Sequence, residues 1–426
     1  MNAQINQILQ LVKTKFFKPI KNQIKSILFK TNRYTINTTS DSINLKSSIP
    51  VTKPTKKVMM LLWPFIAVGG AENLTLSILK EPRILSKFDY INVCLLEPSD
   101  SLGDLSPAFE EISCAFYKAE NFQDTRYINA YIEYLLEYYK VDVLFIPNGT
   151  TVFYDSVQVI KEKFPSLRIV NQVYDHEEGW IRHYDISKAA AIDFHVAPNL
   201  QIREKYMSYQ VPSNRAPLIY HGIDLEVYNP DKLLSANLTA IKHKLELPEN
   251  KIIITFAARI HPQKRPMDFV EIAKQFSPDS RFHFLMVGDG EMAAKVQLEI
   301  DSMKISNITK LGFYKPIQDI YLCTDILVVT SEYEGLPLVV LQSSSMGIPI
   351  VSTSVGAIPD VIKNNENGFL VNQIGDLDLF NYYIQKLANN LEDFKSRSKS
   401  NYIELSHRFS LEKMCESYLE VFEGKL

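Results

Sequence analysis

The sequence has no apolar run long enough to cross a bilayer. A spanning helix needs about 20 mostly apolar residues, and no such run occurs among the 426 residues. The N-terminus also lacks the continuous apolar core and small-residue cleavage site of a secretory signal. We therefore expect no membrane span and a cytoplasmic location.

Cysteine is scarce and scattered. The four cysteines match neither a metal-binding nor a redox spacing, so we expect reduced core residues. They are Cys94, Cys114, Cys323 and Cys415. No Gly-x-Gly-x-x-Gly follows the first predicted strand, which argues against a nicotinamide dehydrogenase. The 46% hydrophobic and 22% charged content is otherwise that of an ordinary globular protein.

Charge is spread unevenly along the chain. The formal net charge is −3, but residues 1–57 hold eleven Lys or Arg and one acid, Asp41, so this segment is +10 and the remainder −13. An acidic body without basic residues interleaved with an aromatic platform argues against nucleic-acid binding.

The basic N-terminal segment has an amphipathic pattern. Apolar residues recur at helical spacing, with most lysines on the opposite side: Ile5, Ile8, Val12, Phe16, Ile20, Ile24 and Ile27. This pattern is typical of a helix that contacts an anionic membrane surface, here through residues 5–30, peripherally at the inner membrane face. A helix packed on the folded body, or a tail ordered only on binding, explains it equally well. Polar residues 35–56 have the composition of a linker.

From Lys57 onward, strand and helix patterns alternate. The predicted strands are 58–63, 90–96, 141–146, 168–174 and 192–197, a short run at 218–220, then 251–258, 282–287, 308–312, 326–329, 348–352 and 368–371. Strands that alternate with helices in this way form parallel sheets covered on both faces. The chain is therefore predicted to be α/β, with two doubly wound Rossmann-like domains and a cleft between them.

The predicted boundaries divide the chain into four parts. Residues 1–56 are the basic segment and linker, and residues 57–228 are the first Rossmann-like domain. Residues 229–405 are the second domain, which follows a polar stretch at 229–250. Residues 406–426 are a C-terminal helix expected to cross back to the first domain.

The most informative stretch is residues 325–353, which reads as strand, loop, helix and strand. Glu334 lies in the loop where the first of these strands ends. Open α/β sheets bind ligands beyond the carboxyl ends of their strands, where helix N-termini favour anions. We therefore expect Glu334 to contact a ligand, although an exposed acid in a loop that also holds Glu332 is the simpler interpretation.

Several motifs, in this order over about 370 residues, resemble the retaining glycosyltransferases of family 4, which have the GT-B fold. They are Gly69-Gly70-Ala71-Glu72, Arg259-x4-Lys264, Val287-Gly288-Asp289-Gly290, Gly312-Phe313, and the region from Ser331 to Asp360 that is similar to the family's Glu-x7-Glu segment. Each motif alone is weak, whereas the ordered set is specific.

The resemblance assigns the second domain to a nucleotide-sugar donor. Arg259 and Lys264 follow a strand end, where a guanidinium fork and an ammonium suit a diphosphate; a solvated basic loop is the alternative. Glu334, with Gly335 and Leu336, corresponds to the segment that holds hydroxyls of the donor sugar. Gly70 is expected beside the donor.

Two positions in the donor domain are more ambiguous. Gly288 borders the nucleotide on this comparison, although a glycine that tightens the turn above the strand, a structural role, is the favoured interpretation. Gln342 stands where the family usually has a second glutamate, which holds the ribose hydroxyls. A glutamine offers one acceptor oxygen and no charge, so this departure affects the affinity for nucleotide more than the reaction class.

The first domain is expected to bind the acceptor. Gly69 lies at the turn after the first strand. Asp175 and His176 follow a later strand, and His176 resembles the family's histidine near the reacting carbon, with Asp175 as the rival. Asp175 and its neighbours also suit a helix cap or a cation. His221 begins a turn that resembles the family's connection between domains, with a structural role or a place at the cleft rim.

The resemblance implies an EC 2.4 hexosyl-type transfer from a nucleotide-sugar to a glycan or lipid-linked saccharide in cell-surface polysaccharide synthesis. Glu334, His176, Arg259 and Lys264 would be the catalytic set, with retention through a front-face step. No metal or other cofactor is expected, because the Asp-x-Asp at 376–378 lies in a late helical pattern and not after a strand. A non-catalytic or partner-dependent GT-B subunit, or a GT-B epimerase, remains an alternative.

Overall fold

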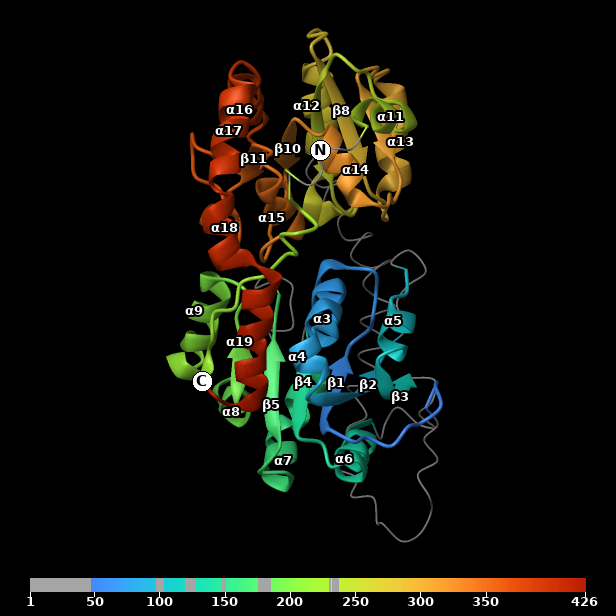
Figure 1. Cartoon of the computed structure of the whole chain (residues 1–426), viewed down its shortest axis with the longest axis vertical. Helices are drawn as coiled ribbons and strands as arrows, with labels where there is room; N and C mark the ends of the chain where they lie inside the picture. Colours follow the sequence, from blue (N-terminus) through green and yellow to red (C-terminus); the bar gives the residue numbers. More distant parts are fainter. Residues whose placement is uncertain are drawn as a thin grey trace, which may run out of the picture.

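The computed structural model describes residues 47–96, 103–118, 128–147, 151–174, 185–229, 231 and 237–426. They form two α/β lobes, one above the other in Figure 1, each built on a parallel sheet. The predicted amphipathic helix in residues 1–46 lies outside the described residues.

The first lobe contains a six-stranded parallel sheet in the order β3-β2-β1-β4-β5-β6. Its strands are β1 (Lys57–Trp63), β2 (Phe88–Cys94), β3 (Ser113–Lys118), β4 (Val143–Pro147), β5 (Arg168–Gln172) and β6 (Phe194–Val196). Its helices are α3 (Gly70–Lys80), α4 (Pro82–Leu85), α5 (Ser106–Glu110), α6 (Ile128–Tyr139), α7 (Thr151–Lys163), α8 (Ile186–Ala191) and α9 (Leu200–Ser208).

The second lobe repeats this topology. Its sheet has the order β12-β11-β10-β7-β8-β9, with β7 (Ile252–Ala257), β8 (Phe282–Val287), β9 (Ile308–Leu311), β10 (Ile326–Val329), β11 (Ile350–Thr353) and β12 (Gly368–Val371). Its helices are α11 (Leu238–Lys244), α12 (Pro266–Gln275), α13 (Ala293–Ser302), α14 (Ile317–Cys323), α15 (Leu338–Ser345), α16 (Leu377–Ala388), α17 (Leu391–Ser400) and α18 (Tyr402–Phe409). In both lobes the order corresponds to 3-2-1-4-5-6, the Rossmann arrangement, which confirms the predicted fold class.

Both faces of each sheet are buried, as alternating side chains along a strand require. In β1, Val58, Met60 and Leu62 pack on the side of α6, α7 and α9. Met59, Leu61 and Trp63 pack on the side of α3, α4 and α5. Strands with two buried faces appear as continuous apolar runs, which is why most of them were predictable.

Two predictions of strands were wrong. The strand β3 was missed, because Ser113–Lys118 is short, begins with Ser-Cys and ends with Lys at an edge of the sheet. Residues 218–220 form no named strand; Leu218 makes only an isolated bridge to Ala197. In addition, residues 48–52 run beside the edge strand, where the Ser48 and Thr52 amides donate to carbonyls of β3 at 2.7 and 2.9 Å.

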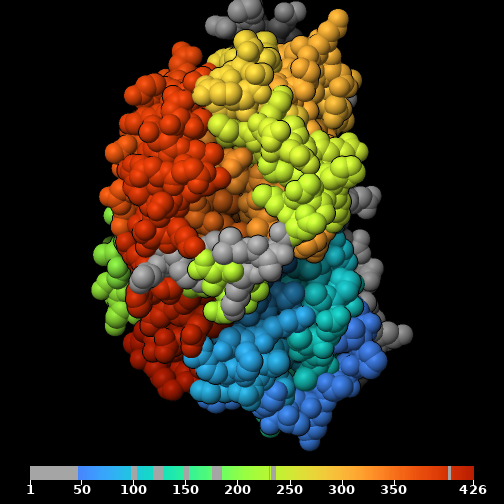
Figure 2. Space-filling model, turned by 45° about the horizontal axis from the view of Figure 1, so that its top comes forward, coloured from blue at the N-terminus to red at the C-terminus, as the bar shows by residue number. Residues whose placement is uncertain are grey.

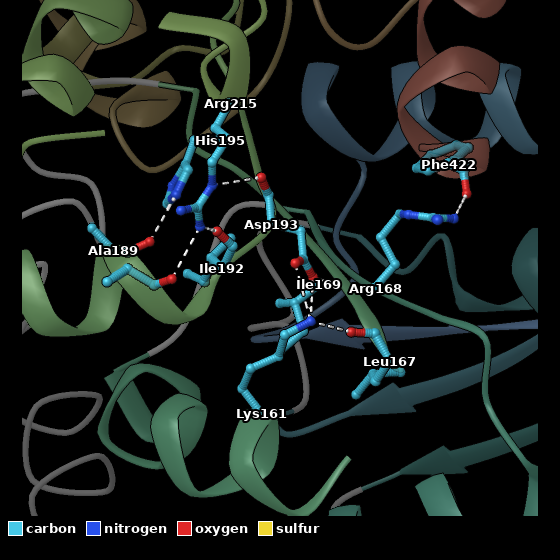
Figure 3. Close-up of polar contacts among 11 residues, drawn as sticks. Lys161, Leu167, Arg168, Ile169, Ala189, Ile192, Asp193, His195, Arg215 and Phe422 are labelled. Atoms are coloured by element: carbon cyan, nitrogen blue, oxygen red, sulfur yellow. Dashed lines mark hydrogen bonds and ion pairs between the residues drawn. The ribbon is translucent and has the colours of Figure 1, made fainter. Parts of the chain in front are cut away.

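The C-terminal helix α19 (Leu411–Glu423) returns from the second lobe to the first (Figure 1). Met414, Cys415 and Tyr418 are buried in the core of the first lobe. Arg168, at the start of β5, donates to the Phe422 carbonyl at 2.6 Å, which fixes the end of the helix (Figure 3). None of the described helices is both long and apolar enough to cross a membrane.

The chain crosses between the lobes twice, and the two crossings are joined. The Ile223 amide donates to the Phe409 carbonyl at 2.9 Å, and the Leu411 amide donates to the Ile223 carbonyl at 2.8 Å. Gly222 lies against this junction: a Cβ there would be 2.6 Å from the Ser410 carbonyl carbon and 2.8 Å from the Leu411 nitrogen. A glycine is therefore required for the two backbones to approach.

Replacing Gly222 by alanine is expected to destabilise the protein by about 1–3 kcal/mol, because a methyl group must push two backbone segments apart. The measurement is the thermal denaturation midpoint. Gly312→Ala is the matched control, since a Cβ at Gly312 has no neighbour within 4 Å. Equal midpoints for the two variants would contradict the close approach described here.

Candidate active site

The site is built where the topology of the second sheet changes direction. β7 and β10 are neighbours at the centre of that sheet. Lys264 ends the 3₁₀ turn Pro262–Lys264 that follows β7, and Glu334 lies in the loop after β10. Ligands of doubly wound sheets bind at such a switch point, beyond the carboxyl ends of the strands. The fold thus brings together two residues that are 70 positions apart in the chain.

Lys264 and Glu334 form a short ion pair, 2.6 Å from Nζ to Oε1. The Ser331 hydroxyl donates to the same oxygen at 2.6 Å, and Glu334 is only 6% exposed. Within the described residues, Oε1 is the only oxygen of the Glu334 carboxylate that accepts a hydrogen bond. A buried carboxylate with one oxygen committed can still accept hydroxyl groups of a ligand through Oε2.

The backbone around this pair is held in place by cross-links between the two loops. The Thr330 hydroxyl donates to the Lys264 carbonyl at 2.8 Å. Gln263 donates through Nε2 to the Tyr333 carbonyl at 2.9 Å, and its own carbonyl accepts from the Glu332 amide at 2.8 Å. These hydrogen bonds fix the backbone that carries the two residues of the ion pair.

Arg259 is exposed, and its guanidinium makes no hydrogen bond or ion pair with the part of the chain that the structure describes. Its charge nevertheless acts on the first lobe, because it lowers the pKa of Glu72 there. Arg259 thus faces the gap between the lobes, with a guanidinium that can bind an anion.

Glu72 also lies at the gap between the lobes, and the sequence analysis did not predict it as a site residue. It lies in the first turn of α3 and is buried. Burial raises the pKa of the Glu72 carboxyl to about 7, against the opposing effects of hydrogen bonds from the backbone of Glu72 and Ala67 and of the Arg259 charge. The signal available in the sequence was the acid that follows the glycine pair, but its burial depends on the fold.

The glycines predicted near the ligand occupy different surroundings. Gly69 precedes α3 and lies against the Glu72 carboxylate, whereas Gly70 begins the helix and a Cβ there would have no neighbour within 4 Å. Gly288 has a φ of +137°, and a Cβ there would be 2.9 Å from the Ala258 carbonyl carbon. Gly288 therefore allows the loop after β8 to pack beside the residue that precedes Arg259.

The loop from Glu334 to Leu336 contacts the first lobe. The Gly335 backbone lies against the Tyr174 carbonyl, and Asn199 donates through Nδ2 to the Gly335 carbonyl at 3.3 Å. His221 lies 2.7 Å from the Leu336 carbonyl through Nδ1. The Glu334–Leu336 loop is therefore held by residues of the first lobe and of its connection to the second, among them His221, for which the sequence predicted a structural role or a place at the cleft rim.

Gln342 lies on α15 between two tyrosines. The Tyr321 hydroxyl donates to Oε1 at 2.6 Å, and Nε2 donates to the Tyr228 hydroxyl at 2.9 Å. Both ends of the Gln342 amide are already engaged, so its orientation is fixed.

Figure 2 shows that the molecule is hollowed above the boundary between the lobes, with atoms in the orange of the α14–α15 region at the bottom.

Asp175 and His176, the predicted acceptor-side residues, lie outside the described residues. No group of three or more His, Cys, Asp and Glu side chains that could hold a metal ion occurs within the described ranges.

Comparison with known proteins matches part of the chain to a family. Residues 238–422 match the model of the family described as Glycosyl transferases group 1. The chain is 32% identical over 187 residues to the UDP-Gal:alpha-D-GlcNAc-diphosphoundecaprenol alpha-1,3-galactosyltransferase of Escherichia coli, covering 42% of this chain and 46% of that protein. It is 25% identical over 166 residues to the N-acetyl-alpha-D-glucosaminyl L-malate synthase of Bacillus anthracis, covering 39% and 42%. The chain thus spans less than half of the length of these two curated relatives.

The solved structures extend the similarity to both lobes at the level of the fold. HepE of Anabaena in complex with UDP-glucose superposes with a TM-score of 0.69 at 14% identity, covering 86% of this chain and 99% of that one. A glycosyltransferase of Rickettsia africae superposes with a TM-score of 0.67 at 20% identity, covering 86% and 98%. Residues 238–422, most of the second lobe and the returning helix, therefore match the glycosyl transferases group 1 family, and the chain as a whole has the two-lobed GT-B fold.

Proposed function

We propose that this protein is a retaining glycosyltransferase of family 4 that moves a sugar from a UDP-sugar to a lipid-linked saccharide in cell-surface polysaccharide synthesis. The observation that carries the proposal is the Lys264–Glu334 pair at the ends of β7 and β10, with the exposed Arg259 nearby. This arrangement lies in the lobe that matches the family. It offers two cations to a diphosphate and one carboxylate to a sugar.

The cations suit the electrostatic demand of the reaction. As the bond between the sugar and the diphosphate breaks, negative charge grows on the leaving oxygen, and fixed cations stabilise that charge. Arg259 supplies a planar fork and Lys264 a compact ammonium. The departing diphosphate can itself take the proton of the acceptor hydroxyl, and the sugar keeps its configuration in a front-face step that requires no metal ion.

Relatives support the choice of substrates. The E. coli relative carries UDP-Gal and a diphosphoundecaprenol-linked acceptor in its name, and the Anabaena structure contains UDP-glucose. We propose a UDP-sugar and a lipid-linked acceptor for the present protein by analogy. The basic apolar segment at residues 5–30 would then hold the enzyme peripherally at the membrane where such an acceptor lies.

One observation favours a second candidate, a non-catalytic nucleotide-sugar-binding subunit. Gln342 replaces a carboxylate of the family, and its amide is engaged by Tyr321 and Tyr228. Such a site has fewer acceptor atoms to offer a ribose.

A thermal-shift screen with UDP-, GDP- and CMP-sugars, run beside a transfer assay with a lipid-linked saccharide, separates the two candidates. Stabilisation depends on the ratio of ligand concentration to its dissociation constant. Stabilisation by UDP-sugars together with transfer supports the enzyme. Stabilisation without transfer supports the subunit, and no stabilisation by any nucleotide-sugar contradicts both.

Glu334→Gln is expected to reduce transfer about 10- to 100-fold, because a charge-assisted hydrogen bond to the sugar is lost. Lys264→Met should lower the stability more than Glu334→Gln does, since it leaves the Glu334 carboxylate buried without its partner. The control is Lys395→Ala, which removes a pair of the same 2.6 Å length, Lys395–Asp325, at the opposite end of β10. A similar loss of transfer in the control and in Glu334→Gln would contradict the assignment.

Glu72→Gln is expected to change how stability depends on pH. Because the pKa of Glu72 is about 7 in the folded protein and near 4.5 in the unfolded chain, the stability it contributes is complete below about pH 4.5 and is lost as pH rises through 7. The glutamine variant does not titrate. Its stability relative to the natural protein should therefore increase by about 3 kcal/mol between about pH 4.5 and pH 8.

The measurement is the difference in denaturation midpoint between the two proteins across this pH range. A difference that stays constant with pH would show that Glu72 is ionised throughout and that its environment has been misjudged.

A further inference from the structure

We propose that His221 belongs to the sugar site: its Nδ1–H positions the Glu334–Leu336 loop, and its Nε2 accepts a hydroxyl of the donor sugar. This inference rests on the proposed function and adds a residue to that site. Two observations carry it: the partners of the two ring nitrogens, and the place of His221 at the junction of the lobes.

The hydrogen-bond partner of Nδ1 determines the tautomer. A carbonyl oxygen can only accept, so Nδ1, which lies 2.7 Å from the Leu336 carbonyl, carries the proton. Burial lowers the pKa of His221 to about 4, against the opposing effects of the Leu336 carbonyl and the Glu334 charge. The ring is therefore neutral near neutral pH, and Nε2 carries a lone pair and no proton.

Nε2 is buried and has no hydrogen-bond partner in the part of the chain that the structure describes. The residue as a whole is 7% exposed. An unsatisfied buried acceptor costs about 1–3 kcal/mol. Stability alone does not explain an imidazole here, whereas a ligand hydroxyl that donates to Nε2 does.

The neighbours of His221 identify the kind of ligand. The charge of Glu334 reaches the ring, and the two residues flank the same short loop. The Tyr174 ring lies 5.5 Å from the imidazole, centroid to centroid, on the side of the first lobe. A neutral acceptor beside a carboxylate with a free oxygen suits a polyhydroxylated ligand, which donates several hydrogen bonds at once, more than it suits a phosphate, which has only acceptor oxygens.

His221 also connects the junction between the two lobes to the Glu334–Leu336 loop. Gly222 and Ile223, which follow it, are fixed to the returning chain at Ser410 and Leu411. Asn199 of the first lobe holds the preceding carbonyl, that of Gly335. Two successive carbonyls after Glu334 are thus bound from the first lobe, so a change in the angle between the lobes moves the Glu334 loop.

Two variants separate the roles of the two nitrogens. Asparagine reproduces the Nδ1–H donor but has nothing at the place of Nε2. Glutamine reaches that place with its amide and loses the Nδ1 donor. The ligands are UDP, UDP-glucose and UDP-galactose, and dissociation constants are measured by calorimetry on the full chain. UDP lacks the sugar and reports the nucleotide site alone.

We expect His221→Asn to weaken binding of the UDP-sugar that the natural protein prefers by about tenfold while binding of UDP is unchanged, the effect of one lost hydrogen bond. His221→Gln should recover part of this affinity, but it should lower kcat because the loop is no longer positioned. The control is His195→Gln. His195 is a fully buried histidine that bonds the Ala189 carbonyl through Nε2 in the first-lobe core (Figure 3). This variant should lower the denaturation midpoint and leave both affinities unchanged.

Three results would overturn the inference: equal weakening of UDP and UDP-sugar by His221→Asn, no weakening of either, or the same effect from the His195 control. If the natural protein binds neither UDP-sugar, the inference and the proposed function fail together. If it binds them without transfer, the enzyme proposal fails, and the role of His221 is still decided by the binding constants.

Discussion

The pair between Lys264 and Glu334 is the interaction on which the site depends. Each residue follows a different central strand, and the buried carboxylate could not be tolerated without its cation. Serine and threonine hydroxyls around the pair satisfy one carboxylate oxygen and hold the lysine backbone. The parallel sheet thus carries a preformed ammonium–carboxylate pair beyond the carboxyl ends of its two central strands.

The second constraint is that the site is completed by both lobes. The loop after Glu334 accepts hydrogen bonds from Asn199 and His221, which belong to the first lobe and to its connection with the second. The return of α19 and the junction at Gly222 restrict how far the lobes can separate. Movement between the lobes therefore changes the surroundings of Glu334 without any change inside the second sheet.

The fold was largely predictable because a parallel strand with two buried faces has an unmistakable apolar pattern, as at 282–287 and 326–329. The edge strand β3 was missed because an edge needs fewer apolar residues and Ser113–Lys118 has little alternation. Arg259, Lys264 and Glu334 could be predicted as candidates because they follow strand ends and because their motifs stand in the order of the family. Glu72 was named only as part of a motif, and His221 only as the start of a turn with a structural role or a place at the cleft rim. Their properties come from burial and, for His221, from a partner more than a hundred positions away.

The environment of Gln342 changes the electrostatics of the proposed donor site. The hydrogen bonds run in one direction, from the buried Tyr321 through the Gln342 amide to the Tyr228 hydroxyl. A carboxylate at this position would instead accept from both tyrosines and add a negative charge. Because the Gln342 amide carries no charge, the acids that oppose the positive charges of Arg259 and Lys264 are Glu334 and Glu72. The pKa of Glu72 is about 7. The site therefore keeps a positive balance, which suits the diphosphate that we propose it binds.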